Sequence, residues 1–265
     1  MGKAIVITSG KGGVGKTTAT ANIGTGLAIM GNKVVVVDTD IGLRNLDVVM
    51  GLENRIVYDI VDVVEKTCRL KQGLIRDKRF DGLYLLPAAQ TKDKTAVKPE
   101  QMLELIKELK EEGFDYIIID SPAGIERGFQ NSIAGADEAF IVTTPEISAV
   151  RDADRVIGLL ESQGIHNPKL IVNRIRYDMV KRGDMMNVED IIDILAIDLL
   201  GVVPDDEAIV ISTNKGEPVV SEEDPLSAKA FRNICNRILG KEVEFLDLNN
   251  SEGKLSKLIK LLFSK

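Results

Sequence analysis

Residues 10–17 read GKGGVGKT, and the interpretation of the whole chain starts from this glycine-rich stretch. It follows an apolar run at residues 4–8 and opens a segment with helical periodicity at residues 17–30. The glycines let backbone N–H groups turn toward phosphate oxygens, and the helix start adds unpaired donors and a partial positive charge. The spacing GxxxxGK[ST] therefore predicts a strand, a phosphate-binding loop and a helix, in that order.

The polar side chains of this loop have separate expected roles. Lys16 should reach the β- and γ-phosphates of a nucleotide, and the Thr17 hydroxyl should ligate Mg²⁺. Lys11 cannot easily fold back onto phosphates held by its own loop, so it either projects toward a nucleotide in a facing subunit or is a solvated turn lysine. The nucleotide-binding residues predicted here are Gly10, Lys11, Gly12, Gly13, Val14, Gly15, Lys16, Thr17 and Thr18.

The rest of the chain alternates between short apolar runs and longer helical patterns. Strands are predicted at residues 4–8, 33–38, 82–86, 116–120, 139–143, 170–173 and 199–203. Helices are predicted at residues 17–30, 99–112, 148–163, 188–195 and 226–239. Most of the apolar runs lack polar alternation, which is typical of parallel strands covered on both faces. We predict one α/β domain of the P-loop NTPase class over residues 1–246, with a mostly parallel sheet and helices on both faces.

Two of the predicted strands end in acidic residues. A valine run ends in Asp38 and Asp40, and an isoleucine run ends in Asp120, followed by a Ser-Pro-Ala-Gly turn that ends at Gly124. Ligands bind beyond the carboxyl ends of parallel strands, so these acids belong beside the phosphate loop. Asp120 is expected to hold Mg²⁺ directly or through water, and Asp40 to lie near the attacking water. A lone acid at such a place is often only a helix cap; strand alternation, if it continues, points Asp38 and Asp40 to opposite faces.

Composition narrows the function classes. The 265 residues are 44% hydrophobic and 28% charged, as in a folded soluble protein, and the net charge of −7 provides no general attraction to nucleic acid. Cys68 and Cys235 lie far apart and His166 is the only histidine, so metal chemistry should use oxygen ligands, which suits Mg²⁺. Without a signal sequence or a spanning apolar run, we expect a cytoplasmic protein.

Several stretches carry a family resemblance. They are the Lys11-containing loop, residues 38–47 (DTDIGLRNLD), 120–124 (DSPAG), 148–155 (SAVRDADR) and 214–219 (NKGEPV). Over essentially its whole length the chain resembles the MinD/ParA family of deviant Walker-A ATPases, and within it the branch that positions the division septum.

This resemblance implies roles for individual residues. Lys11 would act with Lys16 and Asp40 in catalysis, reaching across an ATP-bound homodimer while Asp40 orients water. Asp38 and Asn45 would belong to a first switch, and the segment from Asp120 to Gly124 to a second. The division inhibitor MinC and the activator MinE would bind a surface formed by Ser148, Arg151, Asp152 and Asp154. Adenine would lie near Asn173, Pro204 and Asp205.

The last residues differ in character from the domain. Residues 247–253 form a polar linker, and residues 254–265 read KLSKLIKLLFSK. On a helix, the apolar side chains share one face and the lysines lie on the other side and the flanks. The apolar set is Leu255, Leu258, Ile259, Leu262 and Phe263, and the lysines are Lys254, Lys257, Lys260 and Lys265. A basic amphipathic helix behind a linker predicts an interfacial anchor for anionic phospholipid, the alternative being a last helix packed on its own domain.

We therefore expect an ATPase that uses ATP, ADP and Mg²⁺ and moves reversibly between the cytoplasm and the inner face of the cell membrane. Dimerisation would pair two weak anchors and raise their avidity. The main alternative is a ParA-like DNA-partitioning ATPase, although the only internal basic cluster is Lys181 and Arg182 with Arg174 and Arg176, and we expect no nucleic acid partner. An iron protein would need paired cysteines, and a small-molecule ligase or kinase like dethiobiotin synthetase would need a second substrate.

Overall fold

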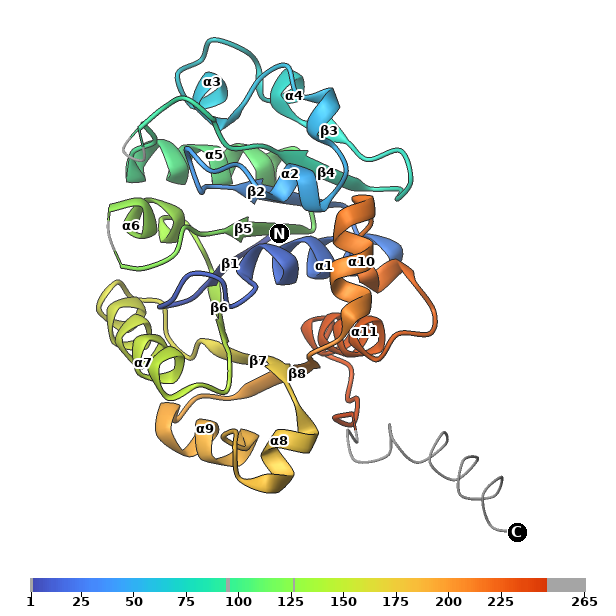
Figure 1. Ribbon diagram of the computed structural model, residues 1–265. Helices are drawn as coiled ribbons and strands as arrows, with labels where there is room; N and C mark the ends of the chain where they lie inside the picture. The colour runs from blue at the N-terminus through green and yellow to red at the C-terminus, as the bar shows by residue number, and fades with distance from the viewer. Residues whose placement is uncertain (1, 94–95, 126, 247–265) are drawn as a thin grey trace.

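The computed structural model describes residues 2–93, 96–125 and 127–246 (Figure 1). Within these residues the centre is an eight-stranded sheet with the order β3-β4-β2-β5-β1-β6-β7-β8. In this sheet β3 and β4 are antiparallel and the other neighbouring pairs are parallel. The predicted mostly parallel sheet is therefore confirmed. The strands are β1 Lys3–Thr8, β2 Val34–Asp38, β3 Ile75–Arg76, β4 Leu83–Leu86, β5 Tyr116–Asp120, β6 Glu138–Thr143, β7 Lys169–Ile175 and β8 Leu199–Pro204.

The central strands are apolar because both of their faces are covered. Val35 and Val37 of β2 belong to one hydrophobic core, and Val34 and Val36 belong to the other. The two cores lie on opposite sides of the sheet, which explains why the valine run shows no polar alternation.

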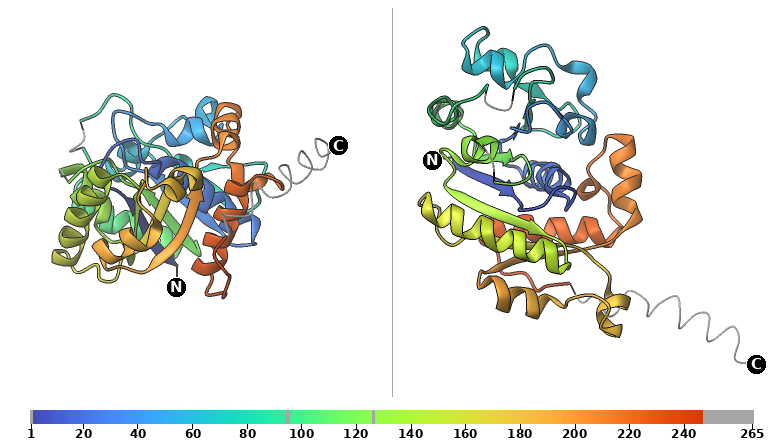
Figure 2. Two further views of the ribbon diagram at one scale, coloured as in Figure 1. Left: turned by 60° about the horizontal axis from the view of Figure 1, so that its bottom comes forward. Right: turned by 60° about the vertical axis from the view of Figure 1, so that its left-hand side comes forward.

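Helices cover both faces of the sheet (Figures 1 and 2). The first core is closed mainly by α5 (Pro99–Glu111) and α7 (Ile147–Ser162), and the second by α1 (Lys16–Ile29) and α11 (Leu226–Ile238). The other α-helices are α2 Leu46–Val49, α3 Ile60–Val64, α4 Leu70–Gly73, α6 Arg127–Ile133, α8 Tyr177–Arg182, α9 Val188–Leu195 and α10 Glu207–Lys215. Two 3₁₀ turns, Glu53–Arg55 and Val219–Ser221, complete the described elements.

The strands predicted from the sequence are all present, with ends within two residues of the prediction. The short elements were not predicted: β3 has two residues and α2 has four, too few to show a period. The polar linker at 247–253 and the amphipathic helix at 254–265 lie outside the described residues. None of the described helices is long and apolar enough to cross a bilayer.

Parallel register brings the functional ends of the strands together. Asp38 of β2 is the register partner of Asp120 of β5, and Ile7 of β1 is the partner of the same Asp120 on the other side. The chain leaves β1 at Thr8 and enters the glycine loop directly beyond this point. The phosphate loop and both predicted acidic strand ends therefore share one edge of the sheet, as expected.

Candidate nucleotide site

The glycine loop has the backbone geometry that its sequence predicts. Gly13 and Gly15 have φ angles of 78° and 99°, in the left-handed region, and Gly15 is the residue from which α1 begins. A Cβ added at Gly15 would lie 2.2 Å from Asn173 Nδ2, and one added at Gly10 would lie 2.2 Å from the backbone of Asp152. The loop is thus wedged between β7 and α7, and only glycine fits at these two contacts.

Lys16 turns inward from the first turn of α1. It is only 7% exposed, and its Nζ donates a hydrogen bond to Ser9 Oγ at 3.0 Å. Ser9 in turn donates to the carbonyl of Lys11 at 2.7 Å, so the hydroxyl joins both ends of the loop. Burial lowers the pKa of Lys16, while the charges of Asp120 and Asp40 oppose that shift. The lysine is therefore poised for an anionic ligand that would complete its surroundings.

Asp120 lies behind the loop, fully enclosed at the end of β5. Thr20 of α1 donates to Asp120 Oδ1 at 3.1 Å, and the Thr17 hydroxyl also hydrogen-bonds this carboxylate. Burial raises the pKa of Asp120 to about 6, against the effects of Thr17, Lys16 and Thr20. Burial and then the neighbouring Asp120 raise the pKa of Asp38 well above its usual range. Two adjacent buried carboxylates form an electrostatically costly pair that a cation would relieve.

The donor set at this point fits a magnesium ion. Thr17 and Asp120 supply oxygen atoms only, and the Thr17 hydroxyl hydrogen-bonds the Asp120 carboxylate. In the described part of the chain, no group of three or more His, Cys, Asp and Glu side chains is placed to hold a metal ion by itself. That pattern suits Mg²⁺, which is usually bound through one or two protein oxygens with phosphate and water as the other ligands.

Lys11 points in the opposite direction from Lys16. Its side chain is 41% exposed, and its Nζ contacts Glu146 Oε2 at 3.0 Å and Ser148 Oγ at 3.2 Å. Both partners belong to the start of α7 in the same chain. Lys11 is therefore held by the start of α7, and whether it reaches a nucleotide on a facing subunit stays a prediction.

The predicted switch residues follow the two strands. The strand ends at Asp38, so the alternation that would point Asp38 and Asp40 to opposite faces does not extend to Asp40. Instead, Asp38 accepts backbone hydrogen bonds from Asp40 at 2.9 Å and from Leu46 at 3.3 Å. Asn45 is exposed where α2 begins, and Gly124 has a φ of 89° with open space around it.

The predicted partner surface follows the line of α7. Ser148 accepts the Lys11 hydrogen bond, while Arg151 and Asp154 are exposed. Asp152 is partly buried because its backbone packs against Gly10. This surface therefore contacts the phosphate loop at two places, Lys11 and Gly10.

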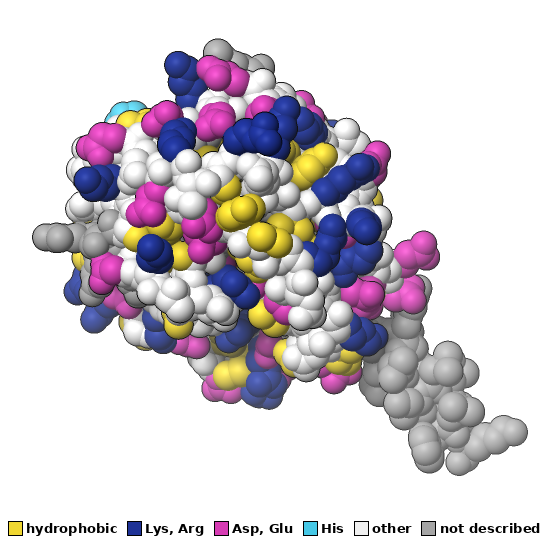
Figure 3. All heavy atoms as spheres, turned by 90° about the horizontal axis from the view of Figure 1, so that it is seen from above, with side chains coloured by type: hydrophobic (Ala, Val, Ile, Leu, Met, Phe, Trp, Pro, Cys, Tyr) yellow, Lys and Arg dark blue, Asp and Glu magenta, His cyan; other side chains and the backbone are white. Residues whose placement is uncertain are grey.

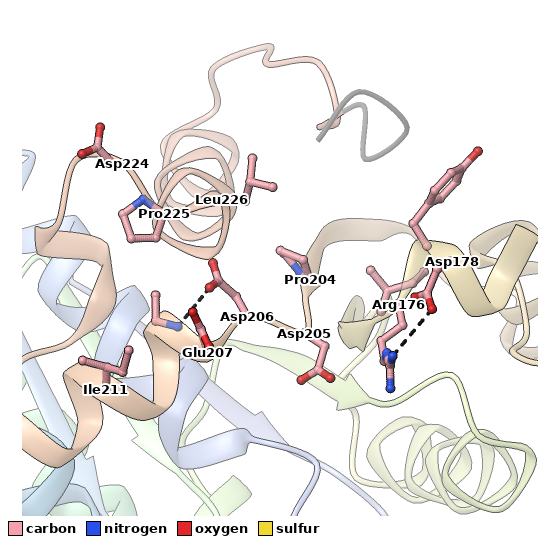
Figure 4. Close-up of a pocket in the computed structure, with 13 residues that line it drawn as sticks. Arg176, Asp178, Pro204, Asp205, Asp206, Glu207, Ile211, Asp224, Pro225 and Leu226 are labelled. Carbon is pink, nitrogen blue, oxygen red and sulfur yellow. Dashed lines mark hydrogen bonds and ion pairs between the residues drawn. The ribbon is translucent and has the colours of Figure 1, made fainter. Parts of the chain in front are cut away.

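A cavity of about 640 Å³ lies beyond the end of β8 (Figure 4). Three segments form its walls: the start of α8, the turn from β8 into α10, and the start of α11. Its lining includes Pro204, Asp205, Ile211, Pro225 and Leu226. The lining combines apolar side chains with five acidic residues, a mixture that can stack against a flat heteroaromatic ring and accept hydrogen bonds from it, and the volume lies in the range of small-molecule sites.

The predicted adenine residues are not all in this cavity. Pro204 and Asp205 line it, as does Ile175, whereas Asn173 does not. Asn173 is buried and donates from Nδ2 to the Val14 carbonyl at 2.8 Å, so its visible contact is with the phosphate loop. The Asn173 Oδ1 atom has no hydrogen-bond partner within the described protein. Strand β7 therefore joins the loop to the cavity, and a direct base contact by Asn173 stays a prediction.

Several residues of the site were not predicted from the sequence. Thr20 had a signal, because it stands one helical turn after Thr17 and hence on the same face of α1. Glu146 is 135 positions from Lys11, and Leu226 enters the cavity from the last described helix. A local sequence pattern cannot predict contacts between residues that are so far apart in the chain.

Comparison with known proteins agrees with this geometry. The family described as the CobQ/CobB/MinD/ParA nucleotide binding domain matches residues 5–219. The septum site-determining protein MinD of Bacillus subtilis is 59% identical, covering 99% of this chain and 98% of that protein.

Two solved structures share the fold. The MinC:MinD cell division protein complex of Aquifex aeolicus superposes with a TM-score of 0.86 at 51% identity, covering 91% of this chain and 98% of that chain. The septum site-determining protein MinD of Pyrococcus horikoshii, complexed with Mg-ADP, gives 0.82 at 32% identity, covering 90% and 96%. The chain therefore belongs to the CobQ/CobB/MinD/ParA family of nucleotide-binding proteins, and within it to the septum site-determining MinD proteins.

Proposed function

We propose that this protein is a Mg²⁺-dependent ATPase that dimerises when it binds ATP, attaches to the membrane as a dimer, and there recruits a division inhibitor. Hydrolysis to ADP and phosphate, accelerated by a partner, would return it to the cytoplasm. The observation that carries the proposal is that Lys16, Thr17 and Asp120 interact with one another where the glycine loop runs into α1. Relatives of high identity support the biological context.

The proposed hydrolysis uses charge rather than a strong base. The loop N–H groups and Lys16 would hold the β- and γ-phosphates, and Asp40 would orient the attacking water. Mg²⁺, held through Thr17 and Asp120, would supply positive charge at the phosphates. Because the only base offered is a carboxylate, turnover without a partner should be slow.

Lys11 would connect nucleotide binding to dimer formation. In the described conformation Glu146 and Ser148 hold it away from its own loop. This exposed ion pair contributes only about 0–1 kcal/mol, so a triphosphate on a facing subunit could readily compete for the lysine. Each Lys11 would then complete the site of the other subunit, which ADP, lacking the third phosphate, would support less well.

The start of α7 is the proposed partner surface. Ser148, Arg151, Asp152 and Asp154 would receive MinC and MinE. Support comes from the complex that the Aquifex aeolicus relative forms with MinC. The contacts of α7 with Gly10 and Lys11 supply a physical route by which a bound partner would affect the phosphate loop.

Membrane attachment is assigned to the amphipathic segment at residues 254–265, behind the linker at 247–253. The support is the sequence pattern alone: one apolar face and four lysines without an acid. A segment of this length forms a marginal helix in water, so binding of lipid would stabilise it. Two copies on one dimer could gain roughly 10²- to 10⁴-fold in avidity.

A DNA-partitioning function is the second candidate. The nearest basic candidates, Arg176 and Arg182, are both paired with Asp178, and Arg182 also with Asp184. On the face shown in Figure 3, acidic and basic side chains are interspersed. Neither the paired arginines at the ends of α8 nor the mixed charges of that face form the one-signed basic surface expected of a DNA-binding protein.

Sedimentation with lipid vesicles tests the proposal. The full chain should pellet with vesicles containing an anionic phospholipid when Mg-ATP is present, and much less with Mg-ADP. A chain ending at Gly253 should stay in the supernatant with either nucleotide. Equal pelleting of the full chain with ATP and ADP would refute nucleotide control, and retention on DNA at moderate salt would support the second candidate.

A further inference from the structure

Arg79 joins two helices that begin on opposite sides of the nucleotide site. It lies in the turn between β3 and β4, and its guanidinium donates to the carbonyls of Met50 and Gly216. Met50 caps the C-terminal end of α2, and Gly216 caps that of α10. The last carbonyls of a helix lack partners within the helix and carry partial negative charge. One cation therefore satisfies two helix ends at once.

Asp77 fixes the orientation of this guanidinium. The Arg79 side chain donates to Asp77 Oδ1 at 3.1 Å through Nε and to Oδ2 at 2.7 Å through Nη2. The Arg79 backbone N–H also donates to Oδ1, at 2.8 Å. Asp77 is buried and its own N–H pairs with Leu83, so the ion pair is anchored to the central sheet through β4. The planar guanidinium is hydrogen-bonded to Asp77 on one side and to the two helix-end carbonyls on the other, so its orientation is fixed.

The two helix ends are also in direct backbone contact. A Cβ at Gly216 would lie 2.6 Å from Gly51 Cα, and a Cβ at Gly51 would lie 2.7 Å from Gly216 O. Both glycines have positive φ angles, 68° and 62°. Hence the C-terminal ends of α2 and α10 are in backbone contact, without side chains between them. Arg79 holds the two ends together through its hydrogen bonds to Met50 and Gly216.

The opposite ends of these helices lie on the two halves of the nucleotide site. Helix α2 begins at Leu46, whose N–H donates to Asp38, so the first turn of the helix is tied directly to the Asp38–Asp40 segment across the five residues between them. Helix α10 begins at the cavity-lining turn, where Asp206 accepts hydrogen bonds from Ala208 and Ser227. At 1.5 Å per residue, α2 is about 6 Å long and α10 about 14 Å, so both are short rigid connections.

We propose that Arg79, oriented by Asp77, is a positioning residue for ATP hydrolysis, which locks α2 to α10 so that the Asp38–Asp40 segment keeps its place relative to the cavity. The inference rests on the proposed function, since it concerns the same site. Arg79 lies at the far end of both helices from the nucleotide. Its loss should therefore leave ATP affinity nearly intact and impair the placement of the carboxylates that the transition state requires.

Steady-state hydrolysis of radiolabelled ATP, a label sensitive enough for slow turnover, tests this role. Arg79→Met should lower kcat about tenfold or more, because misplacement by about 1 Å can cost up to about 100-fold, while KM changes less than about threefold. Arg79→Lys should not restore the rate, because an ammonium carries its donors on one atom and lacks the planar fork whose separate nitrogens reach Met50, Gly216 and both carboxylate oxygens of Asp77. Rates are expressed per molecule that binds a fluorescent ADP, so that a loss of folded protein is not counted.

Arg76→Met is the matched control. Arg76 is the last residue of β3, three residues before Arg79, and both side chains of its 2.6 Å ion pair with Asp81 are exposed. This variant should match the wild type. Hydrogen exchange gives a readout independent of hydrolysis: ADP should protect residues 40–52 in the wild type and in Arg76→Met, and protect them less in Arg79→Met.

The outcomes separate the two claims. If the wild type and Arg76→Met hydrolyse ATP and Arg79→Met does so at the same kcat, the positioning role is wrong. A loss seen only in KM, or a full rescue by Arg79→Lys, would also overturn it. If the wild type itself shows no Mg²⁺-dependent hydrolysis, the proposed function fails, and the inference fails with it. If Arg79→Met does not fold, Arg79→Lys takes its place as the test variant. It should then show the lowered kcat and the nearly unchanged KM expected for Arg79→Met, and an unchanged kcat would overturn the proposal.

Discussion

The two ends of the phosphate loop carry lysines only five residues apart, yet their surroundings are opposite. Lys16 is buried, turned inward to Ser9, and lies within the fields of Asp120 and Asp40. Lys11 is half-exposed and turned outward to Glu146 and Ser148 on α7. The inner lysine belongs to a preorganised site, whereas the outer one is held by a weak contact that it can leave. Under the proposed function, this one loop would both bind a nucleotide through Lys16 and signal its presence to a second subunit through Lys11.

Replacing the inner lysine should have the largest effect. Lys16→Met removes the charge that stabilises the phosphates, and loss of one such preorganised group typically costs about 10²- to 10³-fold in rate. Single-turnover hydrolysis should fall by at least about 100-fold, with Lys33→Met as the control, because Lys33 lies at the other end of β2. If Lys16→Met hydrolysed ATP at a rate within about fivefold of the wild type, Lys16 would not be a phosphate-binding residue.

The buried acid beside Lys16 should give a smaller effect, on stability. Asp120→Asn removes a carboxylate whose pKa burial raises to about 6, while the amide can still accept the Thr20 hydrogen bond. Between about pH 4 and 6 the folded wild type keeps a proton that the unfolded chain releases, so its free energy of unfolding falls as pH rises through this window. Asp120→Asn has no ionisable group at this position, so its free energy of unfolding does not include this decrease with pH.

Denaturant unfolding without nucleotide or Mg²⁺ measures this difference. Asp120→Asn should be more stable than the wild type by about 1 to 3 kcal/mol at pH 7, and the gap should shrink toward pH 4. Asp154→Asn, an exposed acid of α7, should change little. A gap that grows on acidification would contradict the assigned direction of the pKa shift.

The outer lysine offers the smallest and most selective change. Glu146→Gln removes the charge that pairs with Lys11, an exposed interaction of about 0–1 kcal/mol. Release of the lysine should strengthen ATP-dependent dimerisation by up to about fivefold, without a change in ADP affinity. Glu161→Gln, on the same helix, is the control, and weaker dimerisation of Glu146→Gln would mean that the contact supports the active state.

The sequence predicted the inner part of this site well and the outer part poorly. The β-strands have continuous apolar runs, such as the four valines that precede Asp38, and their carboxyl ends must meet at one edge of a parallel sheet. Lys16, Thr17 and Asp120 could therefore be placed together from the amino-acid pattern alone.

The remaining features depend on contacts between distant segments. Helix α2 has four residues and is held by Asp38 at one end and Arg79 at the other, so packing rather than a periodic pattern defines it. The cavity needs walls from α8, α10 and α11, and Leu226 on α11 reaches it together with Pro225, about 20 residues after Pro204 and Asp205. Arg79 looks like any charged turn residue until Met50 and Gly216 are brought to it.

Sedimentation velocity of the wild type and of Lys11→Ala, each with Mg-ATP and with Mg-ADP, tests the central claim most directly. The account predicts that the wild type is dimeric with ATP and monomeric with ADP, and that Lys11→Ala binds ATP yet stays monomeric with either nucleotide. A Lys11→Ala protein that dimerises with ATP as strongly as the wild type would contradict it.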